Sequence, residues 1–357
     1  SQTALPIYFW TRVMQNENNK DELARLTNEF ISSGLLDDLY KNRTGRYGIL
    51  IYQSISKNDL LKELSDSLLQ LITHKLKNDQ VSINTETASR SLLVKRTWYR
   101  FLYAYSNSLY ADIALKKGNN KEAGEYFKAA FDYSPDLKDN NNYSAYFYDM
   151  HFLLEKEKKG FQDEYFNYLT QHSTDTQQAL TTLLKTALTD PSYKAQLQSF
   201  YNKNSAKDEA FSEYWIKNIN ATAKNAPALS IKKRDGVLFS AATNRGKWIL
   251  IDFWGTWCAP CREEHPDLEK FYQSIKTLPG NKITLLTVAC NDDKEKVAAY
   301  MSNFKYTFPV AMADDKIEKA FNINSYPSKI LITPQNKYLV IPFGIDWIDF
   351  IKKYADL

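Results

Sequence analysis

The chain has 357 residues, and at roughly 150 residues per domain this length predicts two domains, each able to bury its own core. Lysine and arginine number 46 and aspartate and glutamate 42, so the net charge of +4 gives no electrostatic reason to bind nucleic acid or anionic lipid. With 43% hydrophobic residues and no apolar run near the ~20 residues of a membrane-spanning helix, the composition predicts a soluble globular protein and excludes a disordered chain.

The first two thirds of the chain show the apolar period of helices. Apolar residues recur every three or four positions, as in Leu23, Leu26, Phe30 and Ile31, and again in Leu60, Leu61, Leu64, Leu68 and Leu71. This spacing is typical of amphipathic helices, and we expect eight to ten of them joined by short polar loops. Asp190 followed by Pro191 predicts that one helix ends and another begins there.

One helical segment, residues 104–137, resembles a tetratricopeptide repeat. Its matching positions are Leu109, Tyr110, Gly118, Ala123, Phe127, Ala130 and Pro135. The resemblance implies two antiparallel helices, and because one repeat cannot bury its own face, neighbouring helices must complete the stack. Two interpretations stay open for the aromatic residues around 98–105: the core of a helical bundle, which is favoured, or a groove that binds a partner peptide.

The chain changes character near residue 226. All three cysteines and eight of the eleven prolines lie beyond this point. We therefore predict an all-α domain over residues 1–225, with a partner-binding role as one option, followed by an α/β domain over residues 226–357.

Beyond residue 226, short β-rich runs alternate with helical ones. The expected elements cover residues 248–253, 261–277, 283–289, 294–304, 329–332, 339–342 and 347–355. A buried strand, a helix and a second buried strand indicate a crossover unit, and hence a sheet with helices on both faces. Residues 233–236 and 335–337 are expected to form hairpin turns.

Cys258 and Cys261 stand at the expected start of a helix, directly after a buried strand. The helix N-terminus offers unpaired N–H groups and a partial positive charge, which favour the thiolate of Cys258 and make it the nucleophile. Cys261, one turn further, is placed to attack the resulting mixed disulfide. Pro260 suits a first helical turn, where its missing N–H has no partner to lose. The spacing predicts disulfide exchange, for which no cofactor is expected.

A metal site is the competing interpretation of the same residues. Cys258, Cys261, His265 and Cys290 would supply the usual four ligands of a zinc ion. The sequence has no second paired motif, and the position of the pair after a strand favours redox chemistry, so no metal is expected. Cys290 follows the expected strand 283–289 and is interpreted as a buried, apolar thiol.

Residues 226–357 resemble a thioredoxin-fold domain, and the run W-C-A-P-C-R-E-E-H-P is similar to that of the TlpA/ResA family of extracytoplasmic thiol–disulfide oxidoreductases. The resemblance implies that Asp252 accepts the proton of Cys261 during resolution. Glu264 falls at a glutamate typical of ResA-like proteins, where it either acts as a second acid or base or is simply solvated.

The same resemblance implies a substrate-binding surface. Tyr326–Pro327 matches the cis-proline position that faces the disulfide, and Trp257 directly precedes the nucleophile. We expect these three residues to contact the substrate chain.

The leading hypothesis is a protein-disulfide reductase that acts on exported proteins, with the helical domain recruiting or restricting the substrate. The direction of electron flow depends on the reduction potential, so a disulfide isomerase or oxidase stays an alternative. A second alternative is a protein-binding module in which the cysteine pair senses redox state.

The expected partners are disulfide-containing proteins and an upstream thiol reductant such as a membrane electron-transfer protein, and not nucleic acid. The resemblance implies a periplasmic or otherwise extracytoplasmic bacterial location. Residues 1–9 hold no basic-then-apolar signal segment, so we expect that a signal peptide was removed or that the sequence begins internally. Membrane contact is expected only through an anchor absent from this sequence.

Overall fold

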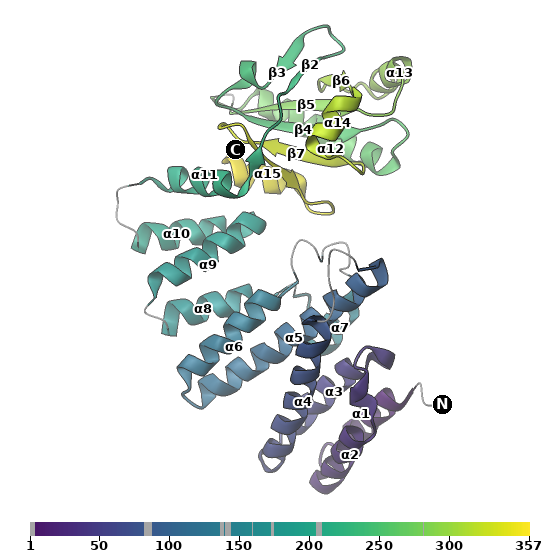
Figure 1. The fold of residues 1–357 in the computed structure, drawn as a ribbon, viewed down its shortest axis with the longest axis vertical. Helices are drawn as coiled ribbons and strands as arrows, with labels where there is room; N and C mark the ends of the chain where they lie inside the picture. Colours follow the sequence, from purple (N-terminus) through teal and green to yellow (C-terminus); the bar gives the residue numbers. More distant parts are fainter. Residues whose placement is uncertain are drawn as a thin grey trace. The chain divides into compact units, whose positions relative to one another are not determined.

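The computed structural model describes residues 4–357 except 82–87, 136–138, 140–143, 159, 173–174, 205–208 and 281. The chain divides into two compact units, Ser1–Thr182 and Leu183–Leu357 (Figure 1). The first unit is helical, and the second combines helices with β-sheet. The predicted order of an all-α region followed by an α/β region is confirmed.

The described residues before the sheet form more helices than the eight to ten expected. They are α1 (Leu5–Gln15), α2 (Lys20–Ser32), α3 (Thr44–Ile55), α4 (Lys62–Val81), α5 (Arg90–Lys116), α6 (Asn120–Tyr133), α7 (Ser144–Leu154), α8 (Gln162–His172), α9 (Thr176–Thr189), α10 (Lys194–Asn204) and α11 (Phe211–Thr222). Short 3₁₀ turns such as Asp59–Leu61 separate neighbouring helices, but the spacing of apolar residues continues through them. The number of helices estimated from that spacing is therefore too low. The predicted break at Asp190 is confirmed, because its carboxylate caps the turn that Pro191 begins.

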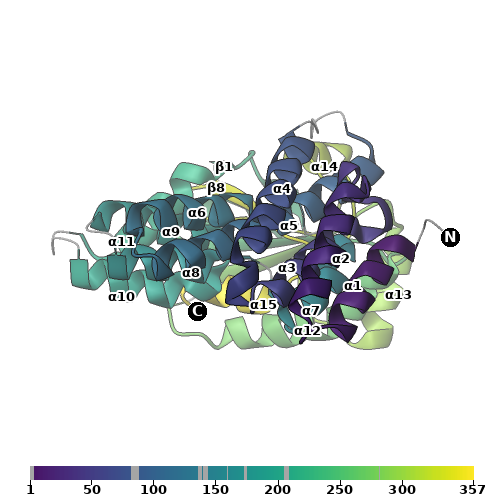
Figure 2. The same ribbon diagram turned by 90° about the horizontal axis from the view of Figure 1, so that it is seen from below.

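Within the first unit, α1 to α4 lie side by side (Figure 2). The aromatic residues of α5 lie in the core: Trp98, Tyr99, Phe101, Tyr103 and Tyr105 are all buried. The favoured interpretation of these residues as bundle core is therefore confirmed.

Helices α5 and α6 form the hairpin expected of the repeat-like segment. Gly118 makes the turn with a φ of 77°, a left-handed conformation that glycine adopts without strain. Ala123 and Ala130 on α6 are fully buried, which lets the two helices approach closely. Helix α8 packs on α6, where a Cβ on Gly124 would clash with the Tyr168 ring. Residues 136–137 of the segment lie outside the described residues.

The second unit contains a sheet with the strand order β1–β8–β7–β4–β5–β6 and a separate hairpin, β2–β3. The strands are β1 (Lys224–Asn225), β2 (Ser230–Lys232), β3 (Leu238–Ser240), β4 (Trp248–Trp254), β5 (Ile283–Ala289), β6 (Val310–Met312), β7 (Ser328–Ile332) and β8 (Lys337–Ile341). The helices that follow β4 are α12 (Ala259–Lys276), α13 (Lys294–Phe304), α14 (Asp315–Phe321) and α15 (Trp347–Ala355). The expected strands and both hairpin turns are confirmed, and β1, β6 and α14 are additional.

Every residue of the central strand β4 is buried, because helices cover both faces of the sheet. Phe253 points to one face and packs against Phe321 of α14. Its neighbour Trp254 points to the other face and packs against His265 of α12. Strand β4 runs parallel to β5 and antiparallel to β7, so the end of β4 that leads into α12 meets the end of β5.

The compact unit that carries the sheet also includes α10 and α11. The Lys194 ammonium on α10 lies 2.6 Å from the Asp356 carboxylate, and the Trp215 indole on α11 donates a hydrogen bond to the Tyr354 carbonyl at 2.9 Å. The predicted domain boundary at residues 225/226 lies directly after β1, the first strand of the chain, and stays a proposal. Within the described residues, no helix combines the length and apolar composition needed to cross a bilayer.

Candidate active site

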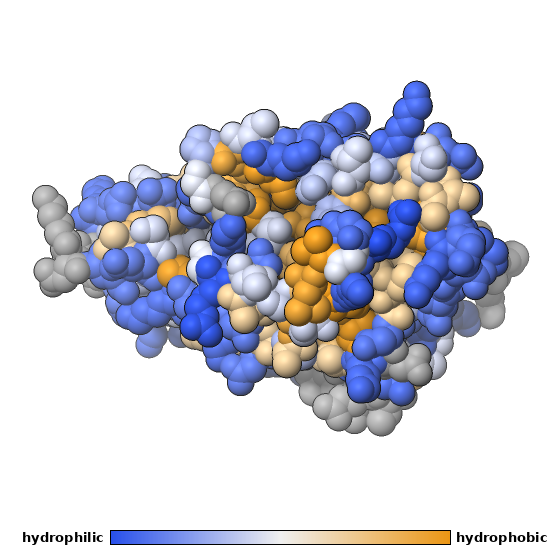
Figure 3. Space-filling view, turned by 90° about the horizontal axis from the view of Figure 1, so that it is seen from above, coloured by the Kyte–Doolittle hydropathy of each residue, from blue (hydrophilic) through white to orange (hydrophobic). Residues whose placement is uncertain are grey.

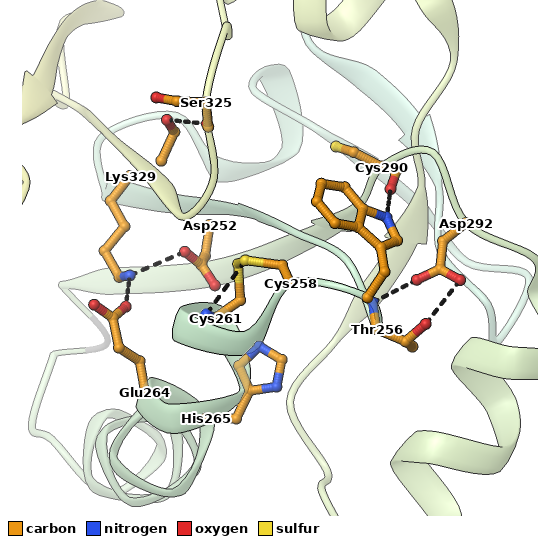
Figure 4. The surroundings of a disulfide bond; sticks show 12 residues. Asp252, Thr256, Cys258, Cys261, Glu264, His265, Cys290, Asp292, Ser325 and Lys329 are labelled. Carbon is orange, nitrogen blue, oxygen red and sulfur yellow. Dashed lines mark hydrogen bonds and ion pairs between the residues drawn. A yellow bond between two sulfur atoms is a disulfide. The ribbon is translucent and has the colours of Figure 1, made fainter.

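Cys258 and Cys261 form a disulfide at the start of α12 (Figure 4). Cys258 is the N-cap of the helix, and its Sγ accepts a hydrogen bond from the Cys261 backbone N–H at 3.3 Å. Pro260 lies in the first turn, as expected. Both cysteines are almost fully buried in this oxidised form, so a partner can reach them only at the surface next to the helix start.

The loop before Cys258 is held by residues that follow β5. Asp292 accepts hydrogen bonds from the Thr256 backbone N–H at 2.5 Å and from its hydroxyl at 3.0 Å. The Trp257 indole donates to the Cys290 carbonyl at 3.2 Å. Asp292 was not predicted from the sequence. The sequence feature that could have indicated Asp292 is its position after β5, which runs parallel to β4. The carboxyl ends of parallel strands lie at the same edge of a sheet, so Asp292 lies near the loop that follows β4.

Trp257, which is exposed, and Tyr326, which is half-buried, form an aromatic surface beside the disulfide. Trp257 is 53% exposed, and its ring meets the Tyr326 ring edge to face at a centroid distance of 5.3 Å. The Tyr326–Pro327 peptide bond is cis, the geometry that the resemblance implied. The Tyr326 hydroxyl accepts a hydrogen bond from Asn291 and donates one to Glu318. The structure brings the three expected substrate-binding residues together, and their role stays a proposal.

Apolar side chains are also exposed elsewhere on the second unit. The large ones are Val237, Leu238, Phe304, Val340 and Phe343. Figure 3 shows orange, apolar side chains gathered in the middle of a face that is otherwise mainly hydrophilic.

A buried cluster of charges lies beside the cysteine pair. Asp252 on β4 is 2% exposed, and its Oδ1 lies 3.1 Å from the Lys329 ammonium. The same ammonium is bonded to the Glu264 carboxylate and lies 5.0 Å above the Trp347 ring. Burial alone would lower the pKa of Lys329, but the charges of Asp252 and Glu264 outweigh it and raise that pKa. Both carboxylates were named from the sequence, whereas Lys329 was missed, because its only signal was a lysine within the apolar run S-K-I-L-I.

His265 is fully buried on α12, among aromatic rings. Its Nδ1 lies 2.9 Å from the Tyr300 hydroxyl. Burial lowers the pKa of His265 to about 4, against a smaller opposing effect of the Asp252 charge. His265 is therefore neutral near pH 7 and packs as part of the core. Across the described residues, no group of three or more His, Cys, Asp or Glu is arranged to hold a metal ion.

We expect His265 to make the stability of the protein sensitive to acid. The pKa of His265 is near 6.5 in the unfolded chain and about 4 in the fold. Its contribution to the free energy of unfolding is therefore complete above pH ~6.5 and is lost as the pH falls toward 4. The loss amounts to roughly 3 kcal/mol. In urea unfolding at a series of pH values, His265→Met should flatten the decline of the free energy of unfolding between pH ~6.5 and 4. The control His74→Met changes an exposed histidine and should leave this decline as it is. A parallel decline in the wild type and His265→Met would contradict the assignment.

Cys290 is fully buried, as the sequence predicted. Burial, together with the charge of Glu318, raises the pKa of its thiol, which keeps the thiol protonated and unreactive near pH 7. The third cysteine is therefore a small apolar core residue.

Comparison with known proteins agrees with this geometry. Residues 246–338 match a thioredoxin-like family model. The thiol–disulfide oxidoreductase ResA of Bacillus subtilis (strain 168) is 26% identical over 160 residues, which cover 44% of this chain and 83% of ResA. The thioredoxin-like protein YneN of the same strain is 30% identical over 112 residues, 30% of this chain and 64% of YneN.

A similar solved structure is the crystal structure of a thiol:disulfide interchange protein from Chlorobium tepidum TLS. It is 29% identical to this chain, and the match covers 37% of this chain and 94% of that one with a TM-score of 0.34. The sequence relatives and the cysteine pair agree on a thioredoxin-like domain of the disulfide-exchanging kind.

Proposed function

We propose that the chain is a thiol–disulfide oxidoreductase that reduces disulfides of exported proteins through Cys258 and Cys261. The observation that carries the proposal is the disulfide between these residues at the N-terminus of α12. The aromatic surface of Trp257 and Tyr326, on which the Trp257 ring is exposed, supports access by a polypeptide substrate. The name of the relative, thiol–disulfide oxidoreductase ResA, supports disulfide exchange. The reducing direction and the extracytoplasmic location are what the resemblance to the TlpA/ResA family implies.

The proposed cycle moves two electrons from the protein to the substrate. The Cys258 thiolate, favoured by the N-terminus of α12, attacks one sulfur of the substrate disulfide. That S–S bond breaks, a mixed disulfide with Cys258 forms, and the leaving sulfur takes a proton from water.

Resolution regenerates the disulfide that the structure contains. Asp252 takes the proton of the Cys261 thiol, and the resulting thiolate attacks Cys258 Sγ. The bond between Cys258 and the substrate breaks, and the substrate leaves as a dithiol after taking up its second proton. Asp252 then releases its proton to water. A thiol reductant must return two electrons to the pair, together with one proton for Cys261, to restore the Cys258 thiolate.

Trapping tests the proposal. Cys261→Ser removes the resolving thiol, so the variant is expected to accumulate a mixed disulfide through Cys258 when it is mixed with insulin or with proteins of the native extract. The adduct should disappear on reduction, and mass spectrometry should locate it at Cys258. Attachment at Cys290, or no adduct while Cys258 remains titratable, would contradict the proposal.

Turnover separates an enzyme from a sensor. With dithiothreitol in excess, the wild-type protein is expected to reduce many equivalents of insulin. A single stoichiometric oxidation, without turnover, would favour the redox-sensing alternative, and refolding of scrambled ribonuclease would favour an isomerase.

A further inference from the structure

Lys329 lies beside the exchange site, and the cycle described above gives it no task. It is only 6% exposed, and its ammonium contacts both Asp252 and Glu264. We propose that Lys329 is a positioning residue that holds Asp252 in its charged form next to the disulfide, ready to take the proton of Cys261. This inference rests on the proposed function and identifies the group on which its proton-transfer step depends.

The register of the sheet places the two groups together. Asp252 and Lys329 are direct partners in the antiparallel pair of β4 and β7, so their side chains leave the sheet on the same face. This is the face that α12 covers with Glu264. Figure 4 shows the Asp252 carboxylate between the Lys329 ammonium and the two sulfur atoms. A register slip of one residue would move Lys329 to the opposite face.

The Lys329 ammonium is the positive charge that contacts Asp252 in the described structure. The Asp252 Oδ1 is buried, and apart from the Lys329 ammonium at 3.1 Å no donor among the described residues is bonded to it. The other titratable groups around it are Glu264, which is acidic, His265, which is neutral near pH 7, and the cysteine pair. A carboxylate buried without an opposite charge takes up a proton. A protonated Asp252 could not accept the proton of Cys261.

Glu264 also contacts the Lys329 ammonium, but its carboxylate needs that positive charge less than Asp252 does. Its side chain is 33% exposed, so water solvates its charge, whereas that of Asp252 is 3% exposed. An ion pair gains more from a low dielectric than from water. Removing Lys329 is therefore expected to affect the ionisation of Asp252 more than that of Glu264.

The two half-reactions can be measured separately with dithiobis(nitrobenzoate). Attack by Cys258 releases the first nitrothiobenzoate, and attack by Cys261 on the mixed disulfide releases the second. With the reduced, full-length protein near pH 7, Lys329→Met is expected to slow the second release about tenfold or more, since raising the pKa of a base by one lowers its ionised fraction up to about tenfold. Its rate should also reach half-maximum at higher pH, while the first release keeps its rate.

Two further variants control for the loss of a buried lysine and for charge. Lys194→Met removes another buried lysine of the same unit, one that also pairs with an aspartate and lies 4.9 Å from a tryptophan ring, and it should leave both releases unchanged. Lys329→Arg keeps the positive charge and should retain the wild-type pH midpoint.

A second comparison, of Asp252→Asn with Asp252→Asn/Lys329→Met, tests the inference even if Lys329→Met alone fails to fold. Lys329→Met buries the Asp252 carboxylate without a positive charge, whereas the double variant has no carboxylate at position 252. If Lys329 acts through Asp252, both have the same second-release rate. A further slowing in the double variant, or a wild-type pH midpoint in a folded Lys329→Met, would overturn the inference. Failure of the proposed function is distinguishable, because the wild-type protein itself would then show no second release.

Discussion

Replacing Cys258 with serine is expected to reduce insulin reduction to the uncatalysed rate. A serine hydroxyl stays protonated near pH 7 and does not attack a disulfide sulfur, whereas we propose that the N-terminus of α12 favours the thiolate of Cys258. Cys261 cannot take over, because it is 1% exposed and faces the core. The rate of insulin precipitation with dithiothreitol as reductant measures the loss.

Cys290→Ser is the matched control, since it makes the same substitution at a cysteine outside the pair. Cys290 is fully buried and is not part of the disulfide, so this variant should retain turnover if it folds. Substantial activity in Cys258→Ser would show that the nucleophile is misassigned. Loss of activity in a folded Cys290→Ser would show that the third cysteine takes part.

The cysteine pair could be predicted from the sequence because its geometry is local. The strand, the first turn of the helix, Cys258 as its cap and Pro260 after it all lie within about a dozen residues, where periodicity and capping rules apply. The burial of Cys290 followed in the same way from its place after a strand.

Lys329 and Asp292 could not be found in this way, since both contacts depend on which strands are neighbours. Asp252 meets Lys329 only because β7 pairs with β4 in one particular register, and Asp292 reaches Thr256 only because β5 lies next to β4. A single sequence gives the strands but not their order or register. The resemblance implied the roles that we propose for Asp252 and Pro327. The place of Asp252 on a buried strand also favoured an acid–base role, whereas nothing in the local sequence indicated that of Pro327.

In the first, helical unit (Ser1–Thr182), the sequence predicted helices but not the contacts that fix them to one another. One such contact links three helices. Asp149 on α7 accepts hydrogen bonds from the Arg46 guanidinium on α3 and from the Trp98 indole on α5. Asp149 is 1% exposed and Arg46 11%, so the charges are largely removed from water. Nothing in the local pattern around these residues indicates that they meet.

Asp149→Ala is expected to lower the free energy of unfolding of the helical unit by about 3–5 kcal/mol, because it leaves the Arg46 charge and the Trp98 N–H buried without a partner. Hydrogen exchange of α5 peptides at increasing urea concentration measures the change. Asp132→Ala is the control: it breaks an exposed ion pair with Lys128 in the same unit, so its effect should stay below about 1 kcal/mol.

The size of this effect would not mean that the ion pair is a large net source of stability. Burial raises the pKa of Asp149 even though Arg46 and Trp98 oppose the rise, so ionising this carboxyl costs more in the fold than in water. Replacing both charges with apolar groups, as in Arg46→Met/Asp149→Leu, should therefore restore most of the stability that either single change removes. A double variant as unstable as the sum of the single ones would contradict this account and would indicate that the two side chains act independently.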